Sequence, residues 1–414
     1  MADTAILNQT AHLLAGVSAK LPADAALRAF FSENRRLTSA VRGRIARALF
    51  SYFRWREWLN PADPWQKKVA VALSFQEKFE AKPESIKAEA LRARAIPAWL
   101  AAEVDLPIET LRLWQREPAL WLRARPGQTA ELAKELNDCV KVDAKLFGPL
   151  DLKVAAPGDL TALRYTGTRD LFTTTAFHAG RFEIQDLASQ LVGYACAPQP
   201  GETWWDACAG EGGKTLHLGD LMGGKGLIWA SDRSNRRLET LKRRASRAKL
   251  FNYRTALWDG TAKLPTKTKF DGVLLDAPCS GVGTWQRNPH ARWTAKPDDV
   301  RELTEVQAQM LNAAATALKP CGRLVYAVCT LTRGETTAIA DAFSAGHPEF
   351  EPVPVFGKWN EKARIGGHAS GDGARGALNS AIQETDTFAD TQLTVWPHVL
   401  NANGMFIAVW RKKG

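Results

Sequence analysis

The first 115 residues carry apolar side chains at every third or fourth position. The pattern is clearest in three stretches: AHLLAGVSAKL, VRGRIARALFSYF and VALSFQEKFE. This is the spacing of an amphipathic helix, whose apolar stripe faces a core. Pro61, Pro64 and Pro83 mark breaks between helices, because a proline cannot continue a helix without losing a backbone hydrogen bond. The pattern predicts an all-α domain over residues 1–115.

From residue 116 the pattern becomes mixed. Short apolar runs (LWLRA, DLKVAA and ALRYT) surround the helix-like stretch TAELAKELNDC. Such a mixture predicts a small α/β domain over residues 116–182. Neither this segment nor the helical one before it contains an arrangement of residues that suggests chemistry, so both are interpreted as scaffold.

From residue 183 to the end, short apolar runs alternate with helical stretches. The runs predict strands at 203–207, 226–231, 253–257, 271–276 and 323–328. Residues 234–249 and 298–318 have the helical pattern between them. This alternation predicts βαβ units and a parallel sheet with helices on both faces. Residues 366–376 hold five glycines without an apolar period, which predicts a mobile loop.

Composition and charge narrow the function. Hydrophobic residues make up 45% and charged residues 24% of the chain, which excludes a fibrous or largely disordered protein. Apolar stretches are too short for a membrane helix, and the opening residues lack a secretory pattern, so we expect a cytoplasmic protein without membrane contact. Lys and Arg total 55 against 44 Asp and Glu, a net charge of +11. Such an excess favours a polyanionic partner, with an ordinary basic enzyme as the alternative.

The basic residues are concentrated in two runs. Residues 231–254 carry nine basic side chains against two acids, and 28–56 carry eight arginines against Glu33 alone. We expect both runs to form an electrostatic track for RNA, although a solvated helix face is an equally good interpretation of any one arginine. The arginines of the first run are Arg28, Arg35, Arg36, Arg42, Arg44, Arg47, Arg54 and Arg56.

A glycine-rich turn follows the first predicted strand of the large sheet. Its sequence, Cys-Ala-Gly-Glu-Gly-Gly-Lys-Thr, covers residues 208–215. Glycines allow a ligand to approach the backbone, and the next helix offers free N–H groups. A nucleotide-triphosphate loop is excluded, because its first glycine would fall at Cys208. Asp232 and Asp259 follow the next two strands, where acids bind ribose in Rossmann-like sites or simply cap turns.

The six cysteines do not form one site, and each is interpreted from its own position in the sequence. None has CxxC spacing, which argues against a structural zinc site, and we expect no metal. Cys139, Cys196 and Cys321 are expected in helical or turn contexts and inert. Cys279 and Cys329 each follow a predicted strand, beside the presumed ligand crevice. A lone cysteine usually packs in a core, but two at neighbouring strand ends point to chemistry.

These motifs together resemble the S-adenosylmethionine-dependent RNA cytosine-5 methyltransferases of the Sun/Fmu (RsmB/NOP) family. The resemblance spans residues 183–414 and implies a Rossmann-like class I methyltransferase domain. More weakly, residues 1–115 resemble a NusB-like RNA-binding domain and residues 116–182 a small RNA-recognition-type domain. The motifs that carry the resemblance are IQDLASQLV, DACAGEGGKT, DAPCSGVG, RNPHARW, YAVCT and the terminal GMFIAVW.

The resemblance implies a role for each reactive residue. Cys329 is the nucleophile that adds to cytosine C6, and Cys279 assists removal of the C5 proton or release of the product. Asp276 binds the N3/N4 edge of the base, and Lys214 lies near the base or the methionine end of the cofactor. Cys329 needs a lowered pKa, which we expect from the start of the following helix and from nearby cations. Arg287, Arg292 and Trp293 are expected near the target RNA.

The same resemblance implies S-adenosylmethionine as cofactor, with Asp232 at the ribose and Asp259 at the adenine. Two departures from the family pattern stand out: Gly210-Glu211 replaces Ala-Pro, and Val328-Cys329-Thr330 replaces Thr-Cys-Ser. Neither removes a reacting group. The expected cofactor contacts are Cys208, Ala209, Gly210, Glu211, Gly212, Gly213, Lys214, Asp232, Arg237, Asp259 and Asp276.

Three alternatives stay open at this point. One is a non-catalytic RNA-binding or ribosome-assembly factor on a methyltransferase fold. Another is a DNA cytosine methyltransferase, in which Cys279 would be the nucleophile. The third is the same RNA chemistry on tRNA, although the upstream resemblance favours ribosomal RNA. The family resemblance also favours a monomer.

Overall fold

The computed structural model describes residues 3–18, 20–142, 161–355 and 391–414. The apolar run DLKVAA and the glycine-rich stretch 366–376 lie outside these residues, so their predicted strand and loop stay predictions. No helix among the described ranges is long and apolar enough to cross a membrane.

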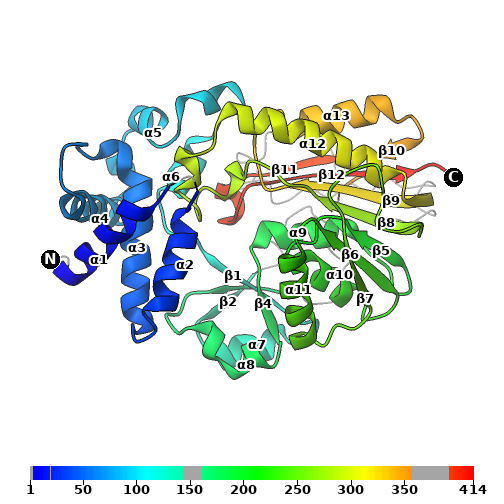
Figure 1. Cartoon of the computed structure of the whole chain (residues 1–414), viewed down its shortest axis with the longest axis horizontal. Helices are drawn as coiled ribbons and strands as arrows, with labels where there is room; N and C mark the ends of the chain where they lie inside the picture. The colour runs from blue at the N-terminus through cyan, green and yellow to red at the C-terminus, as the bar shows by residue number, and fades with distance from the viewer. Residues whose placement is uncertain (1–2, 19, 143–160, 356–390) are drawn as a thin grey trace, which may run out of the picture.

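Helices fill the N-terminal region, as its pattern predicts (Figure 1). They are α1 (Thr4–Gly16), α2 (Ala23–Glu33), α3 (Ser39–Trp55), α4 (Trp65–Ala81), α5 (Ala88–Arg94) and α6 (Ile108–Trp114), with 3-10 turns at Arg56–Trp58, Pro83–Ser85 and Ala98–Ala102. Pro64 immediately precedes α4 and Pro83 opens a 3-10 turn, so both prolines stand at helix breaks. Ile45 and Leu49 of α3 are fully buried in the core that α1, α3 and α4 share.

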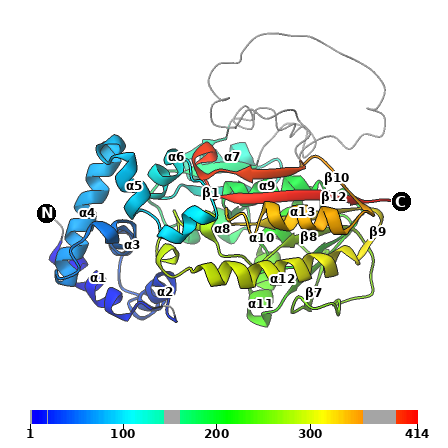
Figure 2. The same ribbon diagram turned by 90° about the horizontal axis from the view of Figure 1, so that it is seen from above.

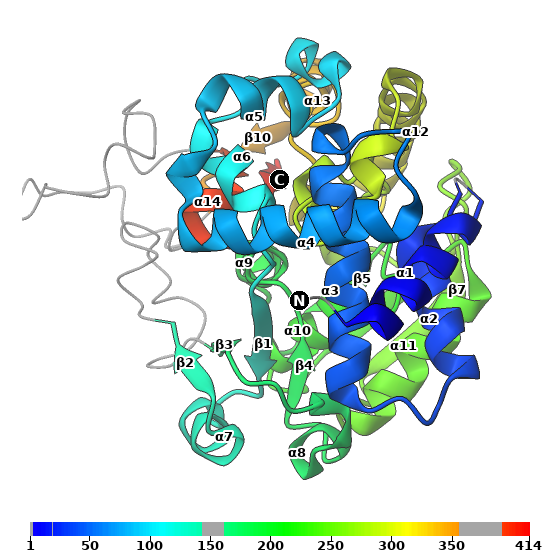
Figure 3. The same cartoon turned by 90° about the vertical axis from the view of Figure 1, so that its left-hand side faces the viewer.

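A four-stranded antiparallel sheet follows (Figure 3). Its strands are β1 (Leu120–Ala124), β2 (Cys139–Lys141), β3 (Ala162–Tyr165) and β4 (Phe182–Ile184), in the order β2-β3-β1-β4 with α7 (Thr129–Leu136) and α8 (Thr175–His178). The expected boundary between residues 182 and 183 falls inside β4, so this sheet continues to Ile184. Cys139 begins β2, which corrects its expected helical or turn context.

A larger sheet forms the C-terminal region (Figure 2). Its order is β10-β12-β9-β8-β5-β6-β7, with β11 paired to β12. The strands are β5 (Thr203–Asp206), β6 (Leu227–Asp232), β7 (Tyr253–Leu257), β8 (Phe270–Asp276), β9 (Leu318–Val328), β10 (Phe350–Pro352), β11 (Gln392–Val395) and β12 (Met405–Lys412). The five predicted strands are confirmed and run parallel. The sheet is nevertheless mixed, because β10, β11 and β12 are antiparallel additions.

β9 begins earlier than its apolar run suggests. It starts at Leu318 and includes Cys321, which is exposed and has a φ of 62°. Cys321 therefore lies in an irregular part of a strand, which corrects its expected helical or turn context. Cys196 ends the helix Leu187–Cys196 (α9), as expected.

Helices cover both faces of the large sheet (Figure 1). They are α9 (Leu187–Cys196), α10 (Gly213–Leu221) and α11 (Asn235–Arg247) on one face, α12 (Pro297–Ala315) and α13 (Thr337–Gly346) on the other, and the short α14 (Pro397–Leu400). Neighbouring residues of β5 show the division: Trp204 packs in the core that includes α9, and Trp205 in the core that includes α12. This alternation along a strand buries both faces and leaves the strand ends as the place for a site.

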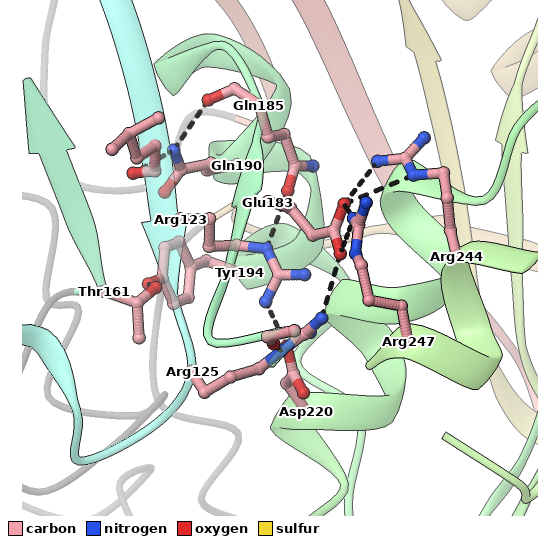
Figure 4. A network of polar contacts seen from close by, with 12 residues as sticks. Arg123, Arg125, Thr161, Glu183, Gln185, Gln190, Tyr194, Asp220, Arg244 and Arg247 are labelled. Carbon is pink, nitrogen blue, oxygen red and sulfur yellow. Dashed lines mark hydrogen bonds and ion pairs between the residues drawn. The ribbon is translucent and has the colours of Figure 1, made fainter. Parts of the chain in front are cut away.

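An ion-pair network joins the small sheet to the large one (Figure 4). Glu183 of β4 is 1% exposed and accepts hydrogen bonds from Arg244 and Arg247 of α11 and from Arg125. These arginines lower the pKa of Glu183 although burial raises it. Removing Glu183 would take away the buried acceptor that these three arginines share, so the network fixes how the small sheet packs on α11.

Candidate active site

Acidic and sulfur-bearing residues gather at the carboxyl ends of the central strands. Asp206 ends β5, Asp232 ends β6 and Asp276 ends β8, while Cys329 directly follows β9. Because these strands are parallel neighbours, their ends lie at one edge of the sheet. Open α/β sheets bind their ligands at this edge.

The Cys279 and Cys329 sulfurs lie 3.4 Å apart, and both residues are half-buried. Backbone hydrogen bonds hold the two loops together, with the Ala277 N–H donating to Ala327 O at 2.9 Å and the Gly283 N–H to Cys329 O at 3.1 Å. The loop after β8 therefore continues the pairing of β8 with β9. This juxtaposition allows one sulfur to donate its proton to the other.

The two thiols differ in acidity. The hydrogen bond from Cys279 lowers the pKa of Cys329, aided by Lys214 and Arg287 and opposed by burial and Asp276. The same hydrogen bond, together with burial, raises the pKa of Cys279 well above its usual value. Of the two sulfurs, Cys329 is therefore the one that ionises more readily. Nearby cations contribute as predicted, but the following helix does not, because α13 begins only at Thr337.

Lys214 and Asp276 form an ion pair beside the sulfurs. The Lys214 ammonium lies 2.6 Å from Asp276 Oδ2. Burial alone would lower the pKa of Lys214, but the charge and hydrogen bond of Asp276 outweigh it and raise this pKa, with a further contribution from Cys329. The pair thus presents a fixed cation and a carboxylate next to the Cys329 sulfur.

The glycine-rich turn has the backbone geometry that a ligand cradle needs. Gly210 and Gly212 have φ values of 56° and 87°, a region that favours glycine. At Gly212 a Cβ would meet Leu241 Cγ at 2.6 Å. Asp232 orients this turn by accepting hydrogen bonds from the Gly210 N–H at 3.1 Å and the Ser234 N–H at 2.8 Å.

The remaining expected cofactor residues are less tightly held. Arg237 Nη1 lies 3.9 Å from Asp232 Oδ2, and more than half of its side chain is exposed. Asp259 is exposed, and its carboxylate accepts hydrogen bonds from the Thr261 N–H and hydroxyl, which lower its pKa. Asp259 therefore has the turn geometry that the sequence left open as the alternative to ligand binding. The structure does not bring it into the cluster of Cys279, Cys329, Lys214 and Asp276. Glu211 is exposed, and its backbone oxygen accepts from Arg244.

Two buried acids at the site, Asp206 and Glu335, are not among the expected catalytic or cofactor-binding residues. Asp206 is fully buried, and burial raises its pKa to about 7. Its Oδ2 accepts from the Thr215 hydroxyl at 2.6 Å, while Oδ1 has no hydrogen-bond partner among the described residues. Its position directly before the glycine-rich turn was a signal that could have found it. Glu335 is also fully buried and contacts both cysteine loops, and no motif in the sequence marks it.

Two of the arginines that were expected to contact RNA, Arg54 of the first basic run and Arg292 near the target, are structural. Arg292 is fully buried, and its guanidinium donates to Gln115 Oε1 at 2.6 Å and to backbone oxygens of the N-terminal region, including Ala95. Arg54 is 2% exposed, and burial lowers its pKa to about 10. Neither side chain is available to RNA, which corrects both expectations. Trp293 donates to Phe53 O at 2.7 Å, and Arg287 is exposed.

A comparison with family models decides the relationship. Residues 193–411 match the model of the family described as 16S rRNA methyltransferase RsmB/F. The chain belongs to the RsmB/F family. This match covers the large sheet and its helices and confirms the resemblance seen in the sequence. The family is S-adenosylmethionine-dependent, which confirms the predicted cofactor.

Curated relatives support the same family. The chain is 34% identical over 244 residues to a probable ribosomal RNA small subunit methyltransferase B of Bacillus subtilis, covering 58% of this chain and 50% of the relative. It is 32% identical over 307 residues to a protein of the same name from Synechocystis, covering 72% and 61%. The RsmB/F chain thus spans about half the length of the curated relatives that it matches.

Solved structures share the fold. The structure titled PH0851 matches with a TM-score of 0.72 at 23% identity, covering 98% of this chain and 97% of that one. A methyltransferase homologue from Pyrococcus horikoshii matches with a TM-score of 0.54 at 23% identity, covering 82% and 99%. These likenesses confirm a Rossmann-like methyltransferase fold for this RsmB/F chain. The NusB-like and RNA-recognition-type relationships of the first two regions stay predictions.

Proposed function

We propose that the chain methylates C5 of a cytosine in RNA through a covalent bond between Cys329 and C6 of the base. The observation that carries this proposal is the 3.4 Å approach of the Cys279 and Cys329 sulfurs, beside the Lys214–Asp276 ion pair. Cytosine C5 is a weak nucleophile, so a mechanism that activates it is required. A thiolate that adds to C6 supplies this activation.

The two cysteines divide the chemistry. The Cys329 thiolate forms a bond to C6, and the electron pair displaced from the C5–C6 double bond makes C5 nucleophilic. Asp276 binds the N3/N4 edge of the base, which favours protonation of the ring as the sulfur adds. After methylation, the Cys279 thiol gives up its own proton to water and its thiolate accepts the C5 proton. The ring releases the proton that it gained on addition, the C5–C6 double bond re-forms and Cys329 leaves as a thiolate. The roles of all three residues are part of the proposal.

The glycine-rich turn and its neighbours would hold the cofactor. The positive-φ glycines, the start of α10 and the buried carboxylate of Asp232 suit a ligand with a nucleoside and a carboxylate. When bound there, S-adenosylmethionine supplies the methyl group. The contacts that we propose are Cys208, Ala209, Gly210, Glu211, Gly212, Gly213, Lys214, Asp232, Arg237, Asp259 and Asp276.

The proposed partner is RNA with an unpaired or flipped target base. The second basic run keeps exposed cations at both ends of α11, including Arg236 and Lys249. An open hollow of about 590 Å³ between α11 and β7 adds aromatic surface, with Phe251 79% exposed beside Arg254. Cations bind phosphates and exposed rings stack on bases, so this surface suits RNA. A target base must leave its stack to reach the sulfurs.

Small-subunit ribosomal RNA is the favoured substrate, because the matched family is described as acting on 16S rRNA. One relative supports tRNA as a second candidate. The mouse protein named tRNA (cytosine(72)-C(5))-methyltransferase NSUN6 is 38% identical over 165 residues, covering 37% of this chain and 34% of the relative. We further propose that the chain acts as a monomer in the cytoplasm.

Bisulfite sequencing of total RNA from cells with and without the gene tests the proposal. A cytosine protected from deamination only when the gene is present identifies the substrate and the position. Parallel assays of purified protein on RNA and on duplex DNA separate the RNA and DNA alternatives. An RNA profile that is identical with and without the gene, together with inactive purified protein, would instead support the non-catalytic RNA-binding alternative.

A further inference from the structure

Glu335 is a fully buried carboxylate that the proposed chemistry does not use. It lies between β9 and α13 and is surrounded by hydrogen-bond donors. Its Oε1 accepts from the Ser280 N–H at 2.8 Å and the Gln307 amide at 3.0 Å. Its Oε2 accepts from the hydroxyls of Ser280, Thr330 and Thr332. A set of donors alone matches an ionised carboxylate, which is only an acceptor.

These donors come from both cysteine loops. Ser280 directly follows Cys279, and Thr330 directly follows Cys329. The hydroxyls of Ser280 and Thr330 also lie 2.9 Å apart, so the two loops meet at Glu335. One carboxylate therefore binds the residue next to each sulfur.

A second layer keeps this arrangement rigid. The Gln307 amide of α12 also donates to Pro278 O at 2.8 Å, one residue before Cys279. The Tyr326 hydroxyl of β9 lies 3.1 Å from Gln307 Oε1 and donates to the Glu335 backbone oxygen at 2.8 Å. Glu335 is thus held by a strand, a helix and two loops, and its charge has a fixed place relative to the sulfurs.

The charges around the two sulfurs are unequal. Cys279 faces a carboxylate, and Cys329 faces two cations as well as one acid. A negative charge favours the neutral thiol, and a cation favours the thiolate. The titratable groups that face Cys279 are Cys329, Glu335 and Tyr326, and those that face Cys329 are Cys279, Asp276, Lys214 and Arg287.

We propose that Glu335 is a positioning residue that joins the two cysteine loops and keeps the shared proton on Cys279, so that Cys329 is the thiolate. This inference rests on the proposed function for its role in catalysis. It acts through Ser280 and Thr330 and through its charge, without contact to the reacting base. The selection of the nucleophile between two adjacent sulfurs is then a property of a third residue.

Cysteine alkylation tests this selection without RNA. The full-length wild type and Glu335→Gln are treated with iodoacetamide across a pH series, and each cysteine is quantified by peptide mass spectrometry. In the wild type we expect Cys329 to react at lower pH than Cys279. In Glu335→Gln the Cys279 profile should move down by about one pH unit and the Cys329 profile should move up, because the charge that separates them is lost. Glu305→Gln, on the exposed face of α12, is the matched control and should keep both wild-type profiles.

Unchanged profiles in folded Glu335→Gln would overturn the inference. If this variant does not fold, Ser280→Ala tests the inference instead, because it removes the hydrogen bond from the Ser280 hydroxyl to Glu335 and keeps the Glu335 carboxylate. We expect its kcat for methyl transfer to fall about tenfold with an unchanged KM for S-adenosylmethionine; a wild-type kcat would overturn the inference. Because alkylation requires no substrate, a failure of the proposed RNA chemistry would leave the alkylation result readable on its own.

Discussion

The two halves of the candidate site are built in different ways. At the ends of β8 and β9, the reactive groups are each other's partners, with Lys214 on Asp276 and Cys279 on Cys329. At the ends of β6 and β7, Asp232 is held by backbone N–H groups and by a long ion pair with the half-exposed Arg237, and Asp259 is exposed on its own turn. The protein thus fixes the proposed reactive groups through their own contacts, whereas at the proposed nucleoside end the ligand would complete the contacts. Fixed charges are the larger contribution to catalysis, since they need no reorganisation during reaction.

The largest effect should come from the nucleophile itself. We expect Cys329→Ala to lose methyl transfer by more than about 10⁴-fold, because the covalent route is removed. Its affinity for S-adenosylmethionine should stay close to that of the wild type. Single-turnover methylation and calorimetric binding measure the two quantities. Activity equal to that of the wild type would remove the mechanism.

A smaller effect, on S-adenosylmethionine affinity, should distinguish Asp232 from Asp259. Asp232→Asn weakens a buried acceptor that orients the glycine-rich turn, and we expect S-adenosylmethionine affinity to fall at least about tenfold. Asp259→Asn changes an exposed turn, and we expect a change within about threefold. Calorimetric titration of both variants checks the difference. Equal losses would show that Asp232 and Asp259 contribute alike to cofactor binding and would contradict the difference between the two strand ends.

A third effect concerns how the stability of the folded protein depends on pH. Burial raises the pKa of Asp206 to about 7 in the folded protein, above its unfolded value. The folded state then binds more protons than the unfolded state between about pH 4 and 7, so this group's contribution to stability falls as pH rises through that window. Asp206→Asn should reduce this loss of unfolding free energy with rising pH by on the order of 2–4 kcal/mol. Urea unfolding at pH 5 and pH 8 measures it, and an unchanged slope between these pH values would contradict the assignment.

Strand position explains what the sequence predicted well. Cys279 and Cys329 each follow a strand, and β8 pairs with β9 in parallel, so their approach was predictable from the pattern and topology. The antiparallel strands β10, β11 and β12 are not among the predicted strands. Runs of three and four residues in β10 and β11 give too little alternation to detect, whereas β12 (Met405–Lys412) was seen only as the terminal motif GMFIAVW and not as a strand.

The long-range partners of buried charged side chains could not be predicted from the sequence. Arg292 lies in a predicted RNA-contacting segment, yet it is buried on carbonyl oxygens from the N-terminal region. A count of charges cannot show which arginine long-range packing will cover. Glu335 was missed for the same reason, since its donors come from separate elements, such as Ser280 and Gln307.

The most direct test of the account is to trap the covalent intermediate. Purified Cys279→Ala is incubated with S-adenosylmethionine and substrate RNA, separated on a denaturing gel, and its linked peptide is identified by mass spectrometry. We predict a stable protein–RNA adduct at Cys329, because the group that releases the product is missing, and no adduct for Cys329→Ala. An adduct formed by Cys329→Ala but not by Cys279→Ala would reverse the two roles and contradict the central claim.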